Sequence, residues 1–414
     1  MRDNTPIIKD MFKAIQVLRK EGIKGLISRF SKRLTNTINT ITHTRDHKAK
    51  LRKIITSKLH RAKGVLIYPP TVDWNVPLFQ RPQHLATELS RLGYLFFYCT
   101  GNNLYDNIQG FQELENNLYV TSRFDLLLRD LTEGWLMISS TNPLITYGDI
   151  RKYRRKGFKI IYDYIDEIHP EISGNVKKMQ ERHRLINKDN VDIVIAVSTR
   201  LYGEMIKRFP EKQVILLPNG AQYEHFRIDR NIEACPDEIR KIIEEGKPII
   251  GYFGALAKWI DYELLNFVAE NRQNWNIVLI GWNYDNTMKQ LKDFRNIKYL
   301  GVKHYNELPK YGIWFDVAAI PFKEGEIAKS SSPIKLYEYM ALNKPVVATR
   351  DLRECYRYKG ILIANDKKEF IEKIEKGLMI KDNPEYIKLL DEQAKENTWE
   401  ARAIMIDGYI SKYK

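Results

Sequence analysis

One short segment in the second half of the chain carries side chains whose types and spacing favour anion binding. Pro333 suits a first helical position, so the following helix would present free backbone N–H groups to an anion, with Ser331 and Ser332 available as caps. Lys335 in the first turn opposes the helix dipole, which is unfavourable unless an anion lies there. Glu338 follows on the same face and can accept hydrogen bonds from a ribose diol. This geometry suits a nucleotide sugar.

The same pattern also fits an ordinary capped helix in which Lys335 and Glu338 form a surface pair three residues apart. The two interpretations differ in where the helix begins. Ligand binding requires that its first turn open into a cleft, whereas a surface pair requires only solvent.

The elements that must position this helix form two groups. From Gly64 onward, short β-branched and aromatic runs alternate with helical patterns, which is typical of βαβ units with parallel strands. Two α/β domains are therefore predicted, spanning residues 63–222 and 223–397, with a cleft between them at the carboxyl ends of the strands. A last helical pattern at 398–414 follows a capping Thr398. The predicted strands are 65–68, 94–99, 136–139, 159–164, 193–197 and 215–217, then 249–253, 277–280, 297–300, 317–321, 346–348 and 361–364.

Residues 1–62 are predicted to form a basic, amphipathic helical extension. Of the net charge of +15, residues 1–63 contribute +13, from 17 Lys/Arg and 4 Asp/Glu, and apolar residues recur there at helical spacing. One interpretation is attachment to an anionic membrane surface, each basic residue contributing about 1 kcal/mol. The alternative is packing on the chain's own body or on a second copy, which would make a homo-oligomer. Nucleic acid is not favoured, because no aromatic residues are interleaved with the charges.

Composition narrows the class of protein further. With 414 residues, 43% hydrophobic, the chain can bury sizeable cores. No apolar run approaches the roughly 18 residues that span a bilayer, and no secretory signal is evident. We therefore expect a cytoplasmic protein, peripheral at the inner face of the cell membrane. Three cysteines without ligand spacing, Cys99, Cys235 and Cys355, indicate neither disulfides nor zinc.

The stretch from Pro333 to Val347 resembles the donor-site helix of GT-B glycosyltransferases, in particular the large retaining family numbered four. Other segments resemble that family in the same order along the chain. These are the P-N-G segment 217–220 with Phe226, the strand and turn 249–254 with Lys258, the acceptor-domain segments 80–86 and 161–167 of polysaccharide-building members, and the start of the last helix at 398–399. The resemblance covers about residues 64–414.

This resemblance implies a GT-B fold, with two Rossmann-like domains facing a cleft and the last helix packed back on the first domain. It implies a metal-independent, retaining hexosyltransferase that needs no cofactor beyond its nucleoside diphosphate sugar. A UDP-sugar is the favoured donor, with GDP- and dTDP-sugars as alternatives. The implied acceptor is a growing, lipid-linked glycan. The expected donor-binding residues are Gly254, Lys258, Ser331, Ser332, Pro333, Lys335, Leu336 and Glu338, of which Lys258 and Glu338 also serve catalysis.

In the first domain, Asp166 is expected at the cleft, where it could orient or deprotonate an acceptor hydroxyl, and His169 is a second candidate. Asp166 could instead cap the next helix. A metal site is not favoured, because Asp163 and Asp166 would point to opposite faces of a continuing strand. Arg81 and His84 on the first helix are expected to meet an anionic acceptor such as a lipid diphosphate, or else to form a surface pair.

Two positions depart from the family pattern. Ser330 stands eight residues before Glu338, where the family has a glutamate that touches the transferred sugar. The usual basic pair after the second-domain glycine turn is reduced to Lys258. The departures keep two alternatives open, an inactive nucleotide-sugar-binding scaffold and a GT-B sugar-nucleotide epimerase.

Overall fold

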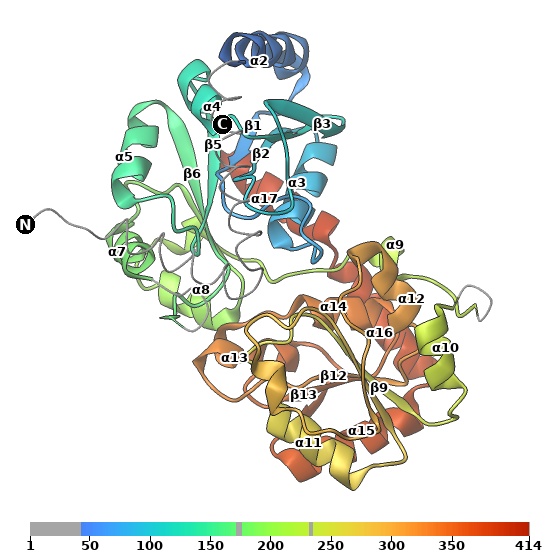
Figure 1. Cartoon of the computed structure of the whole chain (residues 1–414). Helices are drawn as coiled ribbons and strands as arrows, with labels where there is room; N and C mark the ends of the chain where they lie inside the picture. The colour runs from blue at the N-terminus through green and yellow to red at the C-terminus, as the bar shows by residue number, and fades with distance from the viewer. Residues whose placement is uncertain (1–42, 171–175, 232–234, 414) are drawn as a thin grey trace, which may run out of the picture.

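The computed structural model describes residues 43–170, 176–231 and 235–413, which form two α/β domains, one above the other in Figure 1. The first domain has an eight-stranded sheet of order β3-β4-β2-β1-β5-β6-β7-β8, parallel except for the antiparallel pair β3 and β4. Its strands are β1 (Val65–Tyr68), β2 (Leu95–Cys99), β3 (Phe111–Glu115), β4 (Leu118–Thr121), β5 (Gly134–Ser139), β6 (Phe158–Tyr164), β7 (Ile193–Ala196) and β8 (Val214–Leu216).

The second domain has a six-stranded, fully parallel sheet of order β11-β10-β9-β12-β13-β14. Its strands are β9 (Ile249–Phe253), β10 (Asn276–Ile280), β11 (Ile297–Tyr299), β12 (Val317–Ile320), β13 (Val346–Thr349) and β14 (Leu362–Ala364). The prediction of two parallel-dominated sheets is therefore confirmed.

Helices connect the strands as the alternating sequence pattern predicts. The first domain contains α2 (Thr44–Lys58), α3 (Arg81–Arg91), α4 (Phe124–Asp130), α5 (Tyr147–Arg155), α7 (Lys177–Leu185) and α8 (Thr199–Met205). The second contains α9 (Tyr223–Phe226), α10 (Asp237–Ile243), α11 (Tyr262–Asn271), α12 (Leu308–Gly312), α13 (Glu326–Ser330), α14 (Ile334–Ala341), α15 (Lys367–Ile380) and α16 (Pro384–Glu396), and α17 (Trp399–Ile410) follows.

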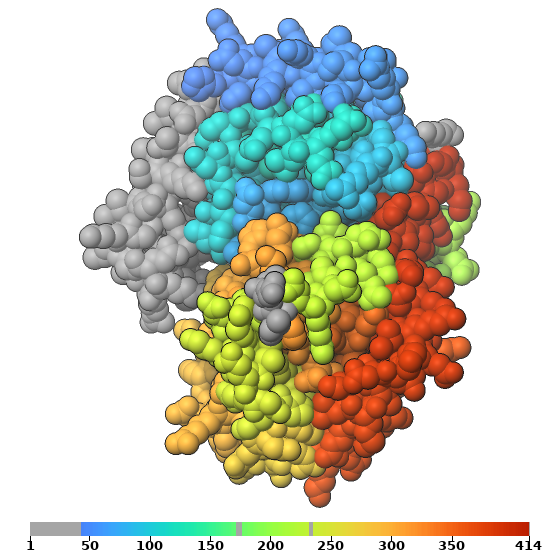
Figure 2. Space-filling view, turned by 90° about the vertical axis from the view of Figure 1, so that its right-hand side faces the viewer, coloured from blue at the N-terminus to red at the C-terminus, as the bar shows by residue number. Residues whose placement is uncertain are grey.

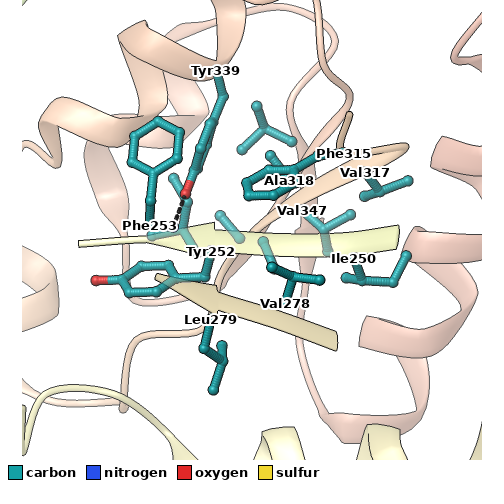
Figure 3. Packing of buried hydrophobic residues seen from close by; sticks show 14 of the residues in the cluster. Ile250, Tyr252, Phe253, Val278, Leu279, Phe315, Val317, Ala318, Tyr339 and Val347 are labelled. Atoms are coloured by element: carbon teal, nitrogen blue, oxygen red, sulfur yellow. Dashed lines mark hydrogen bonds between the residues drawn. The ribbon is translucent and has the colours of Figure 1, made fainter. Parts of the chain in front are cut away.

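The core of the second domain fixes α14 to the end of β9 (Figure 3). The central strands β9 and β12 are buried over their whole length, as expected for a parallel sheet covered on both faces. Phe253 and Tyr339 pack edge to face with ring centroids 4.6 Å apart. The Phe253 backbone N–H also donates to the Tyr339 hydroxyl over 2.9 Å. The helix therefore has a fixed position over the carboxyl end of β9.

The last helix, α17, crosses back to the first domain. Trp399, Ala403, Ile406 and Ile410 are buried in a cluster with β1, β2 and α3 of the first domain. Figure 2 shows the last part of the chain, in red, extending along one side of both domains. The chain thus passes between the domains twice.

The predicted basic extension, residues 1–62, falls in two parts. The apolar series between Ile8 and Leu34 lies outside the described residues. Residues 44–58 form α2, which packs on the first domain and buries Leu51 and Ile54 in its core. This stretch is an integral part of the first domain, because its few apolar residues face the sheet while its basic residues face solvent. Among the described residues, no helix is long and apolar enough to cross a membrane.

We expect Leu51→Ala to lower the free energy of unfolding by about 2–4 kcal/mol, because it leaves a cavity between α2 and the sheet. Lys50→Ala, on the exposed side of the same helix, should change it by less than about 0.5 kcal/mol. Urea unfolding measures both. Equal, small effects of the two variants would contradict the packing of α2.

Candidate functional site

The helix α14 begins at the junction of the two domains. It starts at Ile334, and Pro333 occupies the preceding N-cap position rather than the predicted first helical position. Pro333 still suits the site, because its extended backbone directs the chain into the helix without using a donor. Leu336 is fully buried in the core of the second domain and anchors the first turn. It therefore contributes packing to the site.

Glu338 is a buried carboxylate without a protein partner. Glu338 is only 3% exposed. Among the described residues, no hydrogen bond or ion pair to its carboxylate is found. Burial raises its pKa to about 7, against an opposing effect of the Lys335 ammonium. An ionised carboxylate that is buried without partners costs free energy unless a ligand provides hydrogen-bond donors.

Lys335 lies across the end of β9. A Cβ atom on Gly254, which has φ of +150°, would fall 2.6 Å from Cε of Lys335. Gly281, at the end of β10, has φ of +145° and must also lack a side chain, since its Cβ would fall 1.8 Å from the Gly254 carbonyl oxygen. These glycines open the strand ends to the Lys335 amine. Lys258 lies in the loop after β9, where its backbone N–H donates to Asp285 over 3.0 Å.

The serines before α14 are engaged within the protein. Ser331 donates to the Ile327 carbonyl over 2.6 Å, and Ser330 donates to the Glu326 carbonyl over 2.9 Å. The Ser332 hydroxyl accepts from the Asn219 backbone N–H over 3.2 Å. No serine side chain caps α14, so the predicted capping is wrong. The backbone N–H groups of the first turn therefore remain without a side-chain cap.

Arg81 links the first domain to this junction. Its guanidinium, buried at 3% exposure, binds both carboxylate oxygens of Asp163, with Nε–Oδ2 and Nη2–Oδ1 distances of 3.0 and 3.1 Å. Its Nη1 donates to the Leu217 carbonyl over 3.2 Å and to the Asn219 side chain over 3.1 Å. The Asn219 amide in turn donates to the Ser332 carbonyl over 2.6 Å. Arg81 is thus an interior bridge, neither half of a surface pair nor an open ligand for an anionic acceptor.

The two segments in which the chain passes between the domains also form hydrogen bonds with each other. Arg402 on α17 donates to the Pro218 and Asn219 carbonyls over 3.0 and 3.1 Å. The backbone of Ala221 pairs with that of 397–399, through Ala221 N to Asn397 O at 3.0 Å and Trp399 N to Ala221 O at 3.1 Å. Across the junction, the buried Glu354 carboxylate accepts from the Thr199 N–H at the start of α8 over 2.6 Å.

Asp166 and His169 lie in the segment after β6, the strand that contains Asp163. Burial raises the pKa of Asp166 to about 7, with Arg81 opposing the rise and Asp163 adding to it. The Arg81 and Asp163 charges therefore act on Asp166 at the junction. His169 is half-buried and donates its backbone N–H to the Glu167 carbonyl over 2.9 Å.

His84 is buried in the interface and is 1% exposed. Its imidazole stacks on Trp399, with ring centroids 4.8 Å apart and planes 9° apart. Burial lowers its pKa to about 3, with smaller contributions from His225 and Lys335. The imidazole is therefore neutral at physiological pH and can contact an anion only through a hydrogen bond. The expected contact of His84 with an anionic acceptor stays a prediction.

Sequence reasoning missed three residues of this junction as functional candidates, namely Asn219, Tyr305 and Arg402. Asn219 belongs to the P-N-G segment, so its signal was present in the sequence. Tyr305 follows β11, and its ring centroid lies 5.3 Å from that of His84. No local pattern marks Tyr305 or Arg402, because their contacts are with elements distant in sequence.

Residues 247–379 match the sequence model of the family described as glycosyl transferases group 1. Over 204 residues the chain is 26% identical to the Bacillus subtilis (strain 168) protein named "Putative teichuronic acid biosynthesis glycosyltransferase TuaH", covering 46% of this chain and 50% of the relative. The chain thus spans about half the length of the curated relative it matches. Residues 247–379 of the second domain are therefore similar in sequence to group 1 glycosyltransferases.

Solved structures with the same fold include HepE of Anabaena in complex with UDP, at a TM-score of 0.60 and 13% identity, covering 84% of this chain and 100% of that one. HepE has also been solved with UDP-glucose, at a TM-score of 0.59. The α,α-trehalose 6-phosphate synthase of Burkholderia multivorans has a TM-score of 0.60 at 10% identity, covering 85% of this chain and 99% of that one. These likenesses confirm the predicted GT-B fold.

We expect Arg81→Ala to lower the free energy of unfolding by about 3–5 kcal/mol, because it leaves the buried Asp163 carboxylate unpaired. The double variant Arg81→Ala/Asp163→Ala should lose less than the sum of the two single variants. Urea unfolding of the four proteins measures this coupling. Additive effects would show that the pair is not a buried bridge.

Proposed function

We propose that this chain is a glycosyltransferase that moves a sugar from a nucleoside diphosphate donor, preferentially a UDP-sugar, to a glycan. The observation that carries the proposal is the buried Glu338 carboxylate of α14, which follows Lys335 by three residues and has no partner among the residues that the structure describes. The HepE complexes with UDP and UDP-glucose support a nucleotide-sugar ligand on this fold. The group 1 family match over 247–379, which includes α14, supports transfer chemistry.

In the proposed complex, Glu338 accepts hydrogen bonds from the ribose diol. Lys335, Lys258 and the uncapped N–H groups of α14 bind the diphosphate, with the Gly254 turn giving them access. As the bond from the sugar to the diphosphate breaks, negative charge grows on the leaving phosphate. These preorganised donors stabilise that charge. Such stabilisation is a main source of rate enhancement in enzyme active sites. The proposal needs no metal.

The proton of the acceptor hydroxyl is assigned to Asp166. A carboxylate whose pKa is raised to about 7 is well matched to general-base catalysis near neutral pH. His169 is the second candidate for this role. Retention at the anomeric carbon and hexosyl specificity are carried over from the sequence resemblance. In a retaining transfer of that kind the leaving phosphate accepts the proton on the same face, and Asp166 then orients the acceptor hydroxyl instead of taking its proton.

The proposed acceptor is a growing surface polysaccharide held on a membrane lipid. The name of the Bacillus subtilis relative, which refers to teichuronic acid biosynthesis, supports a polysaccharide. The concentration of basic residues in 1–63 supports attachment at an anionic membrane surface. Since α2 packs on the first domain, this role falls to residues 1–42.

A scaffold that binds the donor without transferring the sugar is the second candidate. Ser330 stands where the resembling family has a glutamate, and its hydroxyl is bonded to the Glu326 carbonyl. Donor turnover with and without an acceptor separates the three cases. Bound nucleotide without turnover favours the scaffold, and sugar conversion without an acceptor favours an epimerase.

The affinity for UDP-glucose should rise about tenfold between pH 6 and pH 8, because a carboxylate with pKa near 7 goes from about one-tenth to nine-tenths ionised. Only the ionised form accepts both ribose hydrogen bonds. Glu338→Gln should abolish this pH dependence and weaken binding at pH 8 by about 2 kcal/mol. Isothermal titration calorimetry measures both effects.

The matched control is Asp166→Asn, which removes the other carboxyl with a pKa near 7 and should retain the rise in affinity. Unchanged affinity and pH dependence in Glu338→Gln would contradict the assignment of this residue to the donor.

Deletion of residues 1–42 should abolish sedimentation with anionic vesicles and leave UDP-glucose affinity unchanged, because the deletion keeps α2 and both domains intact. Neutral phosphatidylcholine vesicles serve as the control surface. Equal sedimentation of the full chain and the shortened chain would refute the membrane role.

A further inference from the structure

Three buried polar atoms lie unpartnered in one cluster at the domain interface. Within the described residues, Nε2 of His84, Oη of Tyr305 and Nε1 of Trp399 have no hydrogen-bond partner. The residues are 1%, 5% and 1% exposed, respectively. Unpaired polar atoms at this depth are rare in folded proteins, because each loses its hydrogen bonds to water without replacement. Their concentration in one place indicates a ligand.

The three side chains come from both domains. His84 lies on α3 of the first domain, Trp399 begins α17, and Tyr305 begins the 3-10 turn η4 (Tyr305–Glu307) of the second domain. The His84 ring centroid lies 4.8 Å from that of Trp399 and 5.3 Å from that of Tyr305. The cluster therefore spans the junction, and the His84 imidazole contacts both the Trp399 and the Tyr305 ring.

The aromatic surroundings fix the direction of these groups. Tyr305 stacks on His225 with centroids 4.8 Å apart and packs edge to face on Phe226 at 5.7 Å. Phe79 packs edge to face on His84 at 4.8 Å. Rings held on several sides have little rotational freedom, so the orphaned atoms are preorganised for a ligand rather than free to find partners in the protein.

Packed rings connect the cluster to α14. The Phe226 ring centroid lies 5.7 Å from that of Tyr305 and 6.1 Å from that of Phe253, which lies 4.6 Å from that of Tyr339, the residue after Glu338. Burial raises the pKa of the Tyr305 hydroxyl and lowers the pKa of His84, and the Glu338 and Lys335 charges add to these shifts. Tyr305 thus stays a neutral phenol and His84 a neutral imidazole. Both can hydrogen-bond to a ligand without adding charge to a site that already holds Lys335 and Glu338.

We propose that Tyr305 and His84 are donor-binding residues, with the Tyr305 hydroxyl bonding to the ribose beside Glu338 and His84 Nε2 bonding to the diphosphate beside Lys335. This inference rests on the proposed function. It moves His84 from the acceptor, where the sequence placed it, to the donor. Because the two residues belong to different domains, the bound nucleotide sugar joins the domains directly.

Tyr305→Phe tests the proposal with the loss of one atom. Since the removed hydroxyl has no protein partner, the melting temperature of the free protein should stay the same or rise. The affinity for UDP-glucose should fall at least fivefold by isothermal titration calorimetry. The matched control is Tyr94→Phe, whose buried hydroxyl donates to Asp407 over 2.7 Å far from the donor residues. That variant should melt at a lower temperature and keep its affinity.

His84→Phe is the second variant, because it keeps an aromatic ring against Trp399 and removes both nitrogens. This variant should lower the affinity for UDP-glucose at least fivefold. The affinity for uridine, a weaker ligand, should stay unchanged because uridine lacks the diphosphate. Unchanged UDP-glucose affinity in both variants would overturn the proposal. If the wild-type chain binds UDP-glucose and Glu338→Gln weakens it while these variants do not, only the further inference fails. If the wild-type chain does not bind it, the proposed function fails first.

Discussion

The buried ion pair between Arg81 and Asp163 is the contact on which the domain junction depends. Both charges are removed from water, so the pair is stable only because the guanidinium also bonds to the Leu217 carbonyl and the Asn219 side chain. Asn219 then binds Ser332, the residue before Pro333. One hydrogen-bonded path therefore runs from the first sheet through the linker to the start of α14. This path fixes where α14 begins relative to the first domain.

The junction contains two kinds of buried polar group, and the difference between them locates the site. Arg81, Asp163, Glu354 and the serines before α14 all have partners within the protein, and they serve the architecture. Glu338, Tyr305 and His84 are equally buried. Within the described part of the chain, Nε2 of His84 and Oη of Tyr305 have no hydrogen-bond partner, and no hydrogen bond or ion pair to the Glu338 carboxylate is found. A folded protein tolerates unpaired groups mainly where a ligand completes them. The unpaired set lies beside Lys335, at the start of a helix whose N–H groups are uncapped.

Much of the fold could be predicted from the sequence, because buried parallel strands read as short continuous apolar runs. Two strands of the first sheet were missed. The edge strand β3 was missed because Phe111–Glu115 is mostly polar and exposed, and beside it lies the short, buried β4. Helix α2 was assigned to a basic extension because charge dominates its composition. The helix α3 shows the main limit of sequence reasoning. His84 looks like a surface residue, yet it is buried because Trp399 at the start of α17, some three hundred residues later, stacks on it. The spacing of Lys335 and Glu338 was readable because both lie on one turn of one helix.

The most direct test of this account is a crystal structure of the chain with UDP-glucose. We expect the ribose hydroxyls within hydrogen-bond distance, about 2.5–3.0 Å, of the Glu338 carboxylate. The diphosphate should lie at the first turn of α14, against Lys335. A nucleotide bound elsewhere in the molecule, with the Glu338 carboxylate still unpaired, would contradict it.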